Sequence, residues 1–168
     1  KFANHWLHNG YVTFNKEKMS KSLGNIITIE KMRKTINGQV IRLALLSSHY
    51  KQPLDWNENL INESQSTLDK WYTQFENTKE DILNDELLQP LLEDINTPAY
   101  IAKLHLLYDK ASKGDNSARK LFLAGCKLIG LLEEDLATWK KFKKSKSKID
   151  ENKIKNKIKD RDKARKKG

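Results

Sequence analysis

From residue 55 onward, apolar side chains recur every three to four residues, and this spacing restricts the fold more than any other feature. Four of them follow the i, i+3, i+4, i+7 pattern of one helix face: Leu68, Trp71, Tyr72 and Phe75. Similar series follow two groups typical of helix starts, Asn96-Thr97-Pro98 and Asn116-Ser117. The sequence therefore predicts a mainly α fold in which about four helices pack as an antiparallel α-helical bundle.

The first 54 residues are less regular. Residues 10–15, GYVTFN, are short, β-branched and aromatic, and they predict a strand that turns at Asn15-Lys16. Thr28 is expected to cap a short helix, and residues 40–48 are apolar almost all round, as in a buried helix. Asp55-Trp56-Asn57-Glu58 has the form of a capping box, so Asp55 is expected to open the next helix.

The net charge of +10 is concentrated at one end of the chain. Residues 140–168 contain 15 Lys/Arg and 4 Asp/Glu, a net of +11, whereas residues 1–139 contain 17 and 18, a net of −1. This excess favours a polyanionic partner, and nucleic acid fits better than a membrane because no wide apolar face accompanies the charge. Residues 140–148, rich in lysine and serine, are expected to form a mobile linker before the basic tail.

Two further properties bound the class of protein. The single cysteine, Cys126, excludes an internal disulfide and fits a reducing compartment. No apolar run approaches the roughly 20 residues of a membrane-spanning helix, so we expect a cytoplasmic protein with no membrane partner. The chain begins at Lys1 rather than at methionine, and we expect it to be part of a longer protein.

Residues 17–25, EKMSKSLGN, place two lysines three apart among small hydroxyl residues, with a glycine close behind. Lysine is a point charge on a flexible stem, which suits it to follow a phosphate group as it moves. Ser20, Ser22 and Gly24 can offer hydroxyl and backbone donors to anionic oxygens. On residue types and spacing alone, a solvated turn between a strand and a helix explains the segment equally well.

The segment Lys18-Met19-Ser20-Lys21-Ser22 is identical to the second signature of the class I aminoacyl-tRNA synthetases, and residues 23–25 continue as in several of them. Other stretches resemble the cysteinyl-tRNA synthetases in particular: residues 6–10 (WLHNG), 45–54 (LLSSHYKQPL) and 96–98, and the tail Ile158-x-x-Arg161-x-x-Ala164-Arg165. The chain therefore resembles that family along nearly its whole length, from the KMSKS loop into the C-terminal helical domain.

This resemblance implies a domain organisation and a reaction. Residues 1–54 would be the end of a Rossmann-type catalytic domain that carries the KMSKS loop and connecting helices. Residues 55–139 would be the helical-bundle domain on the anticodon side, and residues 140–168 a basic linker and helical tail. The complete protein would be a cysteine–tRNA ligase, which uses ATP with Mg²⁺ to form cysteinyl-adenylate and transfers cysteine to the 3′ end of its tRNA.

The resemblance also assigns roles to single residues. Lys18 and Lys21 are expected to act on the ATP phosphates, and three small residues shape the loop around them: Ser20, Ser22 and Gly24. Arg161 and Arg165 are expected to contact tRNA. The family's first signature, His-Ile-Gly-His, and its zinc ligands are not found in these 168 residues. We therefore expect no metal site here, zinc only in the complete enzyme, and no activity from this fragment alone.

Two other functions remain open. A related class I ligase that joins cysteine to an amino sugar would keep the pentapeptide but would have no use for a basic tail. A non-catalytic tRNA-binding helical module would bind tRNA without any ATP chemistry.

The histidine pair and the cysteine each allow a structural or a functional explanation. His5 and His8 are three residues apart and could share a metal, but they sit beside Trp6 with no ligand-forming cysteine or carboxylate at suitable spacing, which favours packing. Cys126 lies among small and apolar residues in a helical pattern, which favours a buried core residue over a reactive thiol.

The aromatic residues and one arginine pose the same choice. Trp71, Tyr72 and Phe75 could stack nucleic-acid bases, but aromatic residues at helical spacing more often form a core. Arg42 stands within an apolar helix, where it would need a carboxylate or phosphate partner or an exposed helix edge.

Overall fold

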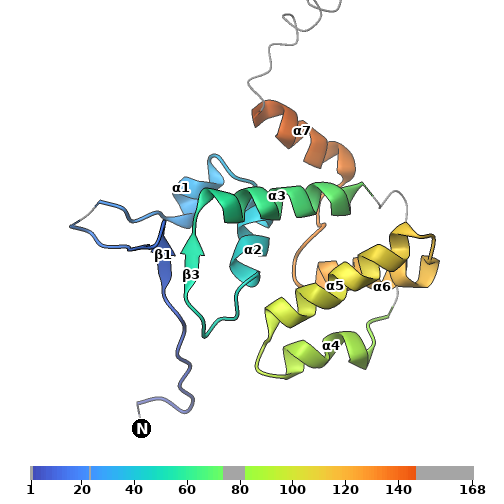
Figure 1. Ribbon diagram of the computed structural model, residues 1–168, viewed down its shortest axis with the longest axis horizontal. Coiled ribbons are helices and arrows are strands. Elements are labelled where there is room, and N and C mark those ends of the chain that lie inside the picture. The colour runs from blue at the N-terminus through green and yellow to red at the C-terminus, as the bar shows by residue number, and fades with distance from the viewer. Residues whose placement is uncertain (1, 23, 74–81, 147–168) are drawn as a thin grey trace, which may run out of the picture. The chain divides into compact units, whose positions relative to one another are not determined.

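The computed structural model describes residues 2–22, 24–73 and 82–146. The secondary-structure elements, in chain order, are β1 (Val12–Phe14), β2 (Glu17–Lys18), α1 (Ile29–Arg33), α2 (Gly38–Leu46), β3 (Leu54–Trp56), α3 (Glu58–Tyr72), α4 (Asp85–Leu92), α5 (Thr97–Ser112), α6 (Asn116–Leu128) and α7 (Leu136–Lys146) (Figure 1). The fold is mainly α, as predicted. Lys1–Leu136 form one compact unit, and Ala137 begins a second.

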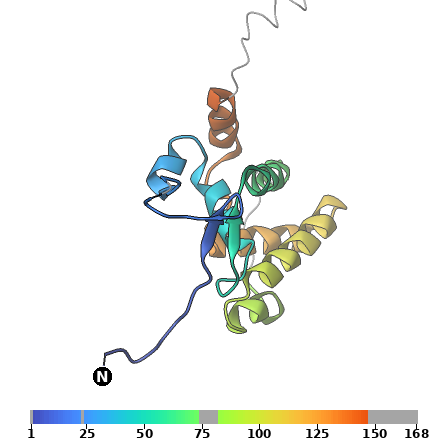
Figure 2. The same cartoon turned by 60° about the vertical axis from the view of Figure 1, so that its left-hand side comes forward.

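The small sheet has the strand order β2-β1-β3. β1 and β2 form an antiparallel hairpin whose two turn residues, Asn15 and Lys16, have φ angles of 50° and 66°. Left-handed backbone at both positions gives a two-residue turn with the twist that a hairpin requires. β3 lies parallel to β1, with Val12 opposite Leu54 (Figures 1 and 2). The predicted strand and turn are confirmed, whereas the second and third strands were not predicted.

The capping-box interpretation of residues 55–58 is wrong. Asp55 lies inside β3, and the N-cap of α3 is Asn57, whose side-chain oxygen accepts a hydrogen bond of 2.9 Å from Leu60 N. The predicted helix start at Thr28 is confirmed, since its hydroxyl accepts from Lys31 N at 3.2 Å. Asp55 and Asn57 are both residues that can cap a helix. Asp55 pairs in the sheet as part of β3, so Asn57 caps α3.

A hydrophobic cluster holds the sheet against α1, α2 and α3. At its centre are Ile41, Ala44 and Trp56, each at most 3% exposed. Partly buried side chains surround them: Phe14, Met32, Ile36, Leu54, Leu60 and Ile61. Because residues from β1, β3 and three helices share this cluster, the hairpin is fixed to the helices by buried apolar area.

The helical part is built on the α5–α6 hairpin, with α4 packed against α5 (Figure 1). Tyr100 is fully buried and donates a hydrogen bond of 2.9 Å to the Gly125 carbonyl oxygen. A Cβ at Gly125 would lie 2.7 Å from Leu104 Cδ2, so the absence of a side chain lets these helices approach closely. The helices that begin after Asn96 and near Asn116 are confirmed, with Asn96 and Asp115 as their N-caps.

A buried polar junction joins α2, α3 and the segment after α6. Gln39 Nε2 donates to the Tyr72 hydroxyl at 2.7 Å, and Gln39 Oε1 accepts from Leu132 N at 2.7 Å. Burial raises the pKa of Tyr72 to about 12, even though the hydrogen bonds from Gln39 and the Glu134 backbone partly oppose it. Apolar surroundings strengthen these bonds and make them costly to break.

The end of the described chain differs from the predicted linker. Residues 140–146 are helical and belong to α7, because lysine has a favourable intrinsic helix propensity. Residues 147–168, which include Arg161 and Arg165, lie outside the described residues, and the divisions at residues 54 and 139 stay predictions. None of the described helices combines the length and apolar character needed to cross a bilayer.

Candidate functional site

The hairpin that carries residues 17–25 is anchored by a carboxylate from β3. Asp55 Oδ1 accepts hydrogen bonds from Thr13 Oγ1 at 2.7 Å and from Lys16 N at 2.6 Å. Asn57 Nδ2 donates to the other oxygen of Asp55 at 2.9 Å. These donors, from Asn57, Thr13 and Lys16 in order of effect, lower the pKa of Asp55. The turn between β1 and β2 is therefore held by a charge-assisted contact from a third strand.

Asn25 closes the base of the loop that follows β2. Its Oδ1 accepts from Ser20 N at 2.8 Å, and its Nδ2 donates to the Lys18 carbonyl oxygen at 3.1 Å. Within the loop, Gly24 N donates to the Lys21 carbonyl oxygen at 3.2 Å. Gly24 has φ +63°, and a Cβ there would meet nothing within 4 Å, so only its backbone conformation favours glycine.

The loop presents its polar groups to solvent. Lys18, Lys21 and Ser22 are exposed, and Ser20 is half-buried with its hydroxyl 3.2 Å from that of Ser22. Two cations three residues apart, with one hydroxyl between them at Ser20 and another directly after them at Ser22, form a donor set suited to phosphate oxygens. A shallow hollow of ≈ 540 Å³ beside the hairpin is also lined by Lys18, together with Tyr11 and Met19.

The five predicted loop residues are neighbours in the sequence, and the structure places them at the end of β2 and in the loop that follows it: Lys18, Ser20, Lys21, Ser22 and Gly24. It also identifies two residues that sequence analysis did not single out. Asn25 is adjacent to the pentapeptide and typical of turns, so it could have been found from the sequence. Asp55 could not, because its partners lie 39 and 42 residues away along the chain.

The histidines near the N-terminus are exposed, and His8 stacks on Trp6 with ring centroids 6.4 Å apart. Within residues 2–22, 24–73 and 82–146, no three His, Cys, Asp or Glu side chains cluster in a way that could hold a metal ion. The packing interpretation of His8 agrees with its ring contact.

The other candidates prove to be mostly structural. Cys126 is fully buried, and burial raises the pKa of its thiol well above the usual value. Trp71 and Tyr72 are buried core residues, with the Trp71 ring edge-on to Phe122 at 5.1 Å, whereas Phe75 lies outside the described residues. Arg42 is on the exposed edge of α2, and its guanidinium lies over Gly130, 3.2 Å from where a Cβ would stand.

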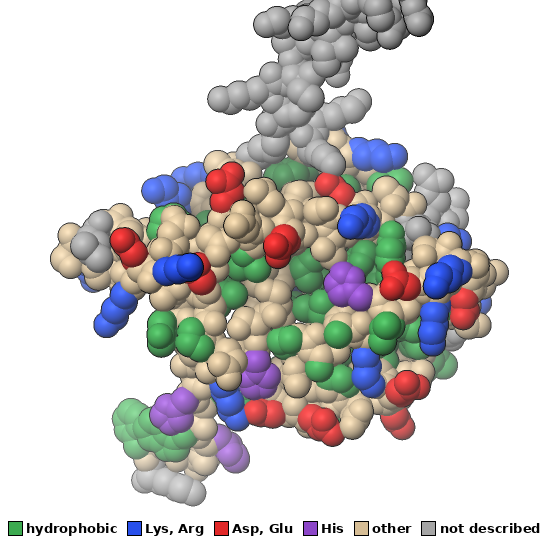
Figure 3. All heavy atoms as spheres, viewed as in Figure 1, with side chains coloured by type: hydrophobic (Ala, Val, Ile, Leu, Met, Phe, Trp, Pro, Cys, Tyr) green, Lys and Arg blue, Asp and Glu red, His purple; other side chains and the backbone are tan. Residues whose placement is uncertain are grey.

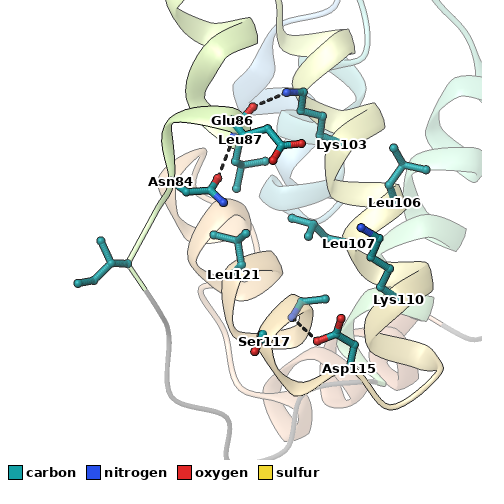
Figure 4. A pocket seen from close by; sticks show the side chains of 12 residues that line it. Asn84, Glu86, Leu87, Lys103, Leu106, Leu107, Lys110, Asp115, Ser117 and Leu121 are labelled. Atoms are coloured by element: carbon teal, nitrogen blue, oxygen red, sulfur yellow. Dashed lines mark hydrogen bonds between the residues drawn. The ribbon is translucent and has the colours of Figure 1, made fainter.

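A second hollow, of ≈ 450 Å³, lies between α4, α5 and α6 (Figure 4). Apolar side chains such as Leu107 and Leu121 share its lining with two lysines of α5, Lys103 and Lys110. Lys103 Nζ donates to the Glu86 carbonyl oxygen of α4. This hollow therefore reflects how the three helices pack, with Lys103 fixing α4 to α5.

Charge on the described surface is mixed rather than concentrated. Acidic and basic side chains are interspersed over the face shown in Figure 3. This distribution agrees with the net charge of −1 over residues 1–139. The described surface therefore offers no broad positive field on this face, and the exposed cations of the loop are Lys18 and Lys21 themselves.

Comparison with known proteins gives a consistent result. Residues 1–66 match the family model described as tRNA synthetases class I (C) catalytic domain. The chain is 51% identical over 165 residues to a protein of Pelagibacter ubique (strain HTCC1062) named Cysteine--tRNA ligase. That alignment covers 98% of this chain and 36% of the relative.

Two further relatives carry the same name. The protein of a Bradyrhizobium species (strain BTAi1) is 39% identical, covering 98% of this chain and 35% of that protein. The protein of Rickettsia bellii (strain OSU 85-389) is 39% identical, covering 98% of this chain and 37% of that protein. The chain thus spans little more than a third of the length of the curated relatives it matches.

Proposed function

We propose that this chain, whose residues 1–66 belong to the class I (C) tRNA synthetase catalytic-domain family, is part of a cysteine–tRNA ligase. The observation that carries the proposal is the anchored loop with Lys18 and Lys21 exposed at its surface. Its support is the name shared by relatives that are 51% and 39% identical over 98% of the chain.

The proposed reaction has two steps. The carboxylate of cysteine attacks the α-phosphorus of ATP, a carboxyl–phosphate bond forms, and the bond to the β-phosphate breaks so that pyrophosphate leaves. A hydroxyl of the 3′-terminal adenosine of tRNA then attacks the cysteinyl carbonyl and releases AMP. Negative charge builds on phosphate oxygens in the first step, and positive groups placed there lower its barrier.

The loop residues divide this work. Lys21, at the exposed part of the loop, contacts the departing phosphates, and Lys18, at its base, supports it. Ser20 and Ser22 donate hydroxyl hydrogen bonds to the same oxygens, and Gly24, whose N–H donates to the Lys21 carbonyl oxygen, shapes the loop through its backbone conformation. Asn25 and Asp55 hold the two ends of the segment in place, so only the tip needs to move when ATP binds.

Metal ions enter the proposal in different ways. Mg²⁺, when bound with ATP, adds positive charge to the phosphates that Lys18 and Lys21 contact. The described residues do not provide a zinc site, and we assign none of them to zinc. We place the complete protein in the cytoplasm, with ATP, cysteine and tRNA as its partners. The basic residues after Lys140, including Arg161 and Arg165, are proposed to contact tRNA, with the helical bundle on the anticodon side.

The test is ATP–pyrophosphate exchange by the full-length gene product, assayed with each amino acid in turn. We expect exchange that requires cysteine and that falls roughly 10²-fold in Lys21→Ala, the usual loss when a contact to developing charge is removed. Lys31→Ala is the matched control, because Lys31 is an exposed lysine of α1.

Three results would contradict the proposal in distinguishable ways. Exchange that requires another amino acid would reject the specificity for cysteine. Cysteine-dependent exchange without transfer to tRNA would indicate a ligase for a different acceptor, such as an amino sugar. Binding of tRNA with no exchange at all would leave an RNA-binding module.

A further inference from the structure

A second carboxylate contact joins the segment before β3 to the turn between α4 and α5. The turn between α4 and α5 carries Asp94, whose two carboxylate oxygens bind two neighbouring residues of the segment before β3. Oδ1 accepts from the Tyr50 hydroxyl at 2.6 Å, and Oδ2 accepts from Lys51 Nζ at 2.5 Å. His49 Nε2 lies 3.8 Å from Oδ2, and the His49 and Tyr50 rings stack at 4.8 Å.

The turn that carries Asp94 has unusual backbone. Asp94 and Ile95 have φ angles of 59° and 54°, and a β-branched residue adopts such a conformation only at a cost. The contacts to Tyr50 and Lys51 help to hold this turn, and Thr97 adds a hydrogen bond of 3.5 Å to the Ser48 carbonyl oxygen. Residues 48–51 and the start of α5 are therefore joined through side chains.

The backbone of Tyr50 also contacts the segment that leads into the hairpin. Its carbonyl oxygen accepts a hydrogen bond of 2.7 Å from Gly10 N, just before β1. The approach is so close that a Cβ at Gly10 would lie 2.1 Å from the Gln52 carbonyl oxygen. Tyr50 thus binds the α4–α5 turn with its side chain and the entry to β1 with its backbone.

From Gly10 the connection to the loop is short. Tyr11 accepts from Leu54 N at 3.0 Å, β1 pairs with β3, and Asp55 holds the hairpin turn. The loop with Lys18 and Lys21 leaves directly from β2 of this hairpin. Each of these contacts is a hydrogen bond or strand pairing within the compact unit Lys1–Leu136.

We propose that Asp94 is a positioning residue for the KMSKS loop, acting through Tyr50 and Gly10 to set the hairpin relative to the helical part. This inference rests on the proposed function, and it names a residue of the helical part as a determinant of the activation step. Coupling of this kind requires a demonstrated energetic effect and not only a chain of contacts. Variants at both ends of the contact supply that demonstration.

The exposure of the Asp94 contact distinguishes a positioning role from a contribution to folding stability. The Asp94 and Lys51 side chains are 52% and 51% exposed, and ion pairs in such positions contribute little to folding free energy. We therefore expect the protein to stay folded when Asp94 is replaced. What it changes is the restraint on residues 48–52 and, through them, on Gly10.

The experiment compares Asp94→Asn, Tyr50→Phe and the double variant in the full-length gene product. The matched control is Asp109→Asn, an exposed carboxylate of α5. Cysteine-dependent ATP–pyrophosphate exchange gives kcat and the KM for cysteine, and hydrogen–deuterium exchange follows the peptide that spans residues 8–18. Asp94→Glu, which keeps the charge, is the rescue variant.

We expect kcat to fall about 3- to 10-fold in Asp94→Asn and Tyr50→Phe, the range of effects seen for residues that modulate coupling. The KM for cysteine and the midpoint of thermal unfolding should match those of Asp109→Asn. Deuterium uptake by the peptide of residues 8–18 should become faster. The kcat of the double variant should be no lower than that of the weaker single variant, and Asp94→Glu should recover part of the lost kcat.

If Asp94→Asn and Asp109→Asn have the same kcat and the same deuterium uptake in residues 8–18, the inference is overturned. It is also overturned by a fall in kcat that only follows a lower unfolding midpoint. If the wild-type protein shows no ATP–pyrophosphate exchange with cysteine, the proposed function fails. Deuterium uptake in residues 8–18 of Asp94→Asn then still shows whether Asp94 orders the hairpin.

Discussion

The carboxylate of Asp55 and the hydroxyl of Thr13, 42 residues apart in the chain, are joined by a hydrogen bond of 2.7 Å. The same oxygen of Asp55 also binds the backbone of Lys16 in the hairpin turn. We predict that Asp55→Ala accelerates deuterium uptake in residues 13–18 and lowers the rate of ATP–pyrophosphate exchange, because the turn loses its acceptor. Asp109→Asn serves as the control, and unchanged uptake in residues 13–18 would contradict this role.

The anchor should also depend on pH. The pKa of Asp55 is lowered in the folded protein from an ordinary value of 3.8, so its contribution is fully present above that value. The contribution is lost as the pH falls through the folded pKa, since the unfolded chain then binds the proton first. Deuterium uptake in residues 13–18, corrected for intrinsic rates, should therefore rise on acidification below about pH 4. Asp55→Asn should not show this transition.

Tyr72→Phe tests the buried polar junction. The substitution removes the hydroxyl that accepts from Gln39 Nε2 at 2.7 Å and leaves that donor buried. We expect the free energy of unfolding to fall by about 1–3 kcal/mol, measured by chemical denaturation. Tyr108→Phe is the control, because its hydroxyl makes a longer contact of 3.4 Å to the Lys70 carbonyl oxygen near the surface. Equal effects of the two substitutions would contradict the importance of the junction.

The junction also predicts a loss of stability in alkali. Tyr72 has a folded pKa of about 12, above the ordinary value of 10.0. Its contribution is present below 10 and is lost as the pH rises toward 12, because the unfolded chain releases the proton first. Denaturation curves of the wild type and Tyr72→Phe should converge over this interval.

Gly125→Ala and Gly38→Ala form a matched pair for helix packing. Both substitutions lower the conformational entropy of the unfolded chain by the same amount, which favours the folded state equally in the two variants. A Cβ at Gly38 meets nothing within 4 Å, whereas one at Gly125 would lie 2.7 Å from Leu104 Cδ2 and 3.0 Å from Leu87 Cδ2. We expect Gly125→Ala to be less stable than Gly38→Ala by about 1–3 kcal/mol. Equal stability would mean that Leu104 of α5 and Leu87 of α4 can shift away from α6 without cost.

Removal of residues 147–168 tests the proposed tRNA contact. This segment carries 10 Lys/Arg and 4 Asp/Glu, a net of +6. In the full-length protein, its removal should weaken tRNA binding at low salt and flatten the dependence of affinity on salt concentration, because fewer counterions are released. Filter binding from low to moderate salt measures both quantities. An unchanged slope would exclude this segment from the interface.

Much of the helical fold could be predicted from local sequence, and the physical reason is plain. Thr28, Asn96 and the residues around Asn116 stand at helix starts, where their side chains satisfy nearby backbone donors. The loop residues Lys18 to Gly24 are contiguous, so the sequence brings them together without any tertiary contact.

What sequence analysis missed depends on distant partners. Leu54–Trp56 become a strand only because β1 is available beside them, and this pairing overrides the capping pattern that starts at Asp55. Asp94 acquires its partners from residues 43 and 44 positions earlier, and nothing in its own neighbourhood indicates them. The run of lysines in residues 140–146 predicts a solvated linker by its charge, whereas the favourable helix propensity of lysine lets these residues continue α7.

The parallel pairing of β1 with β3 has a consequence for synthesis of the chain on the ribosome. A two-stranded hairpin alone is marginally stable in water, and the third strand is translated only after α1 and α2. The turn before Lys18 and Lys21 can therefore be anchored only after Asp55 and Trp56 have emerged from the ribosome. A nascent chain stopped before these residues would carry the pentapeptide without the strand that anchors its turn, so the loop can reach its final geometry only after β3 has emerged.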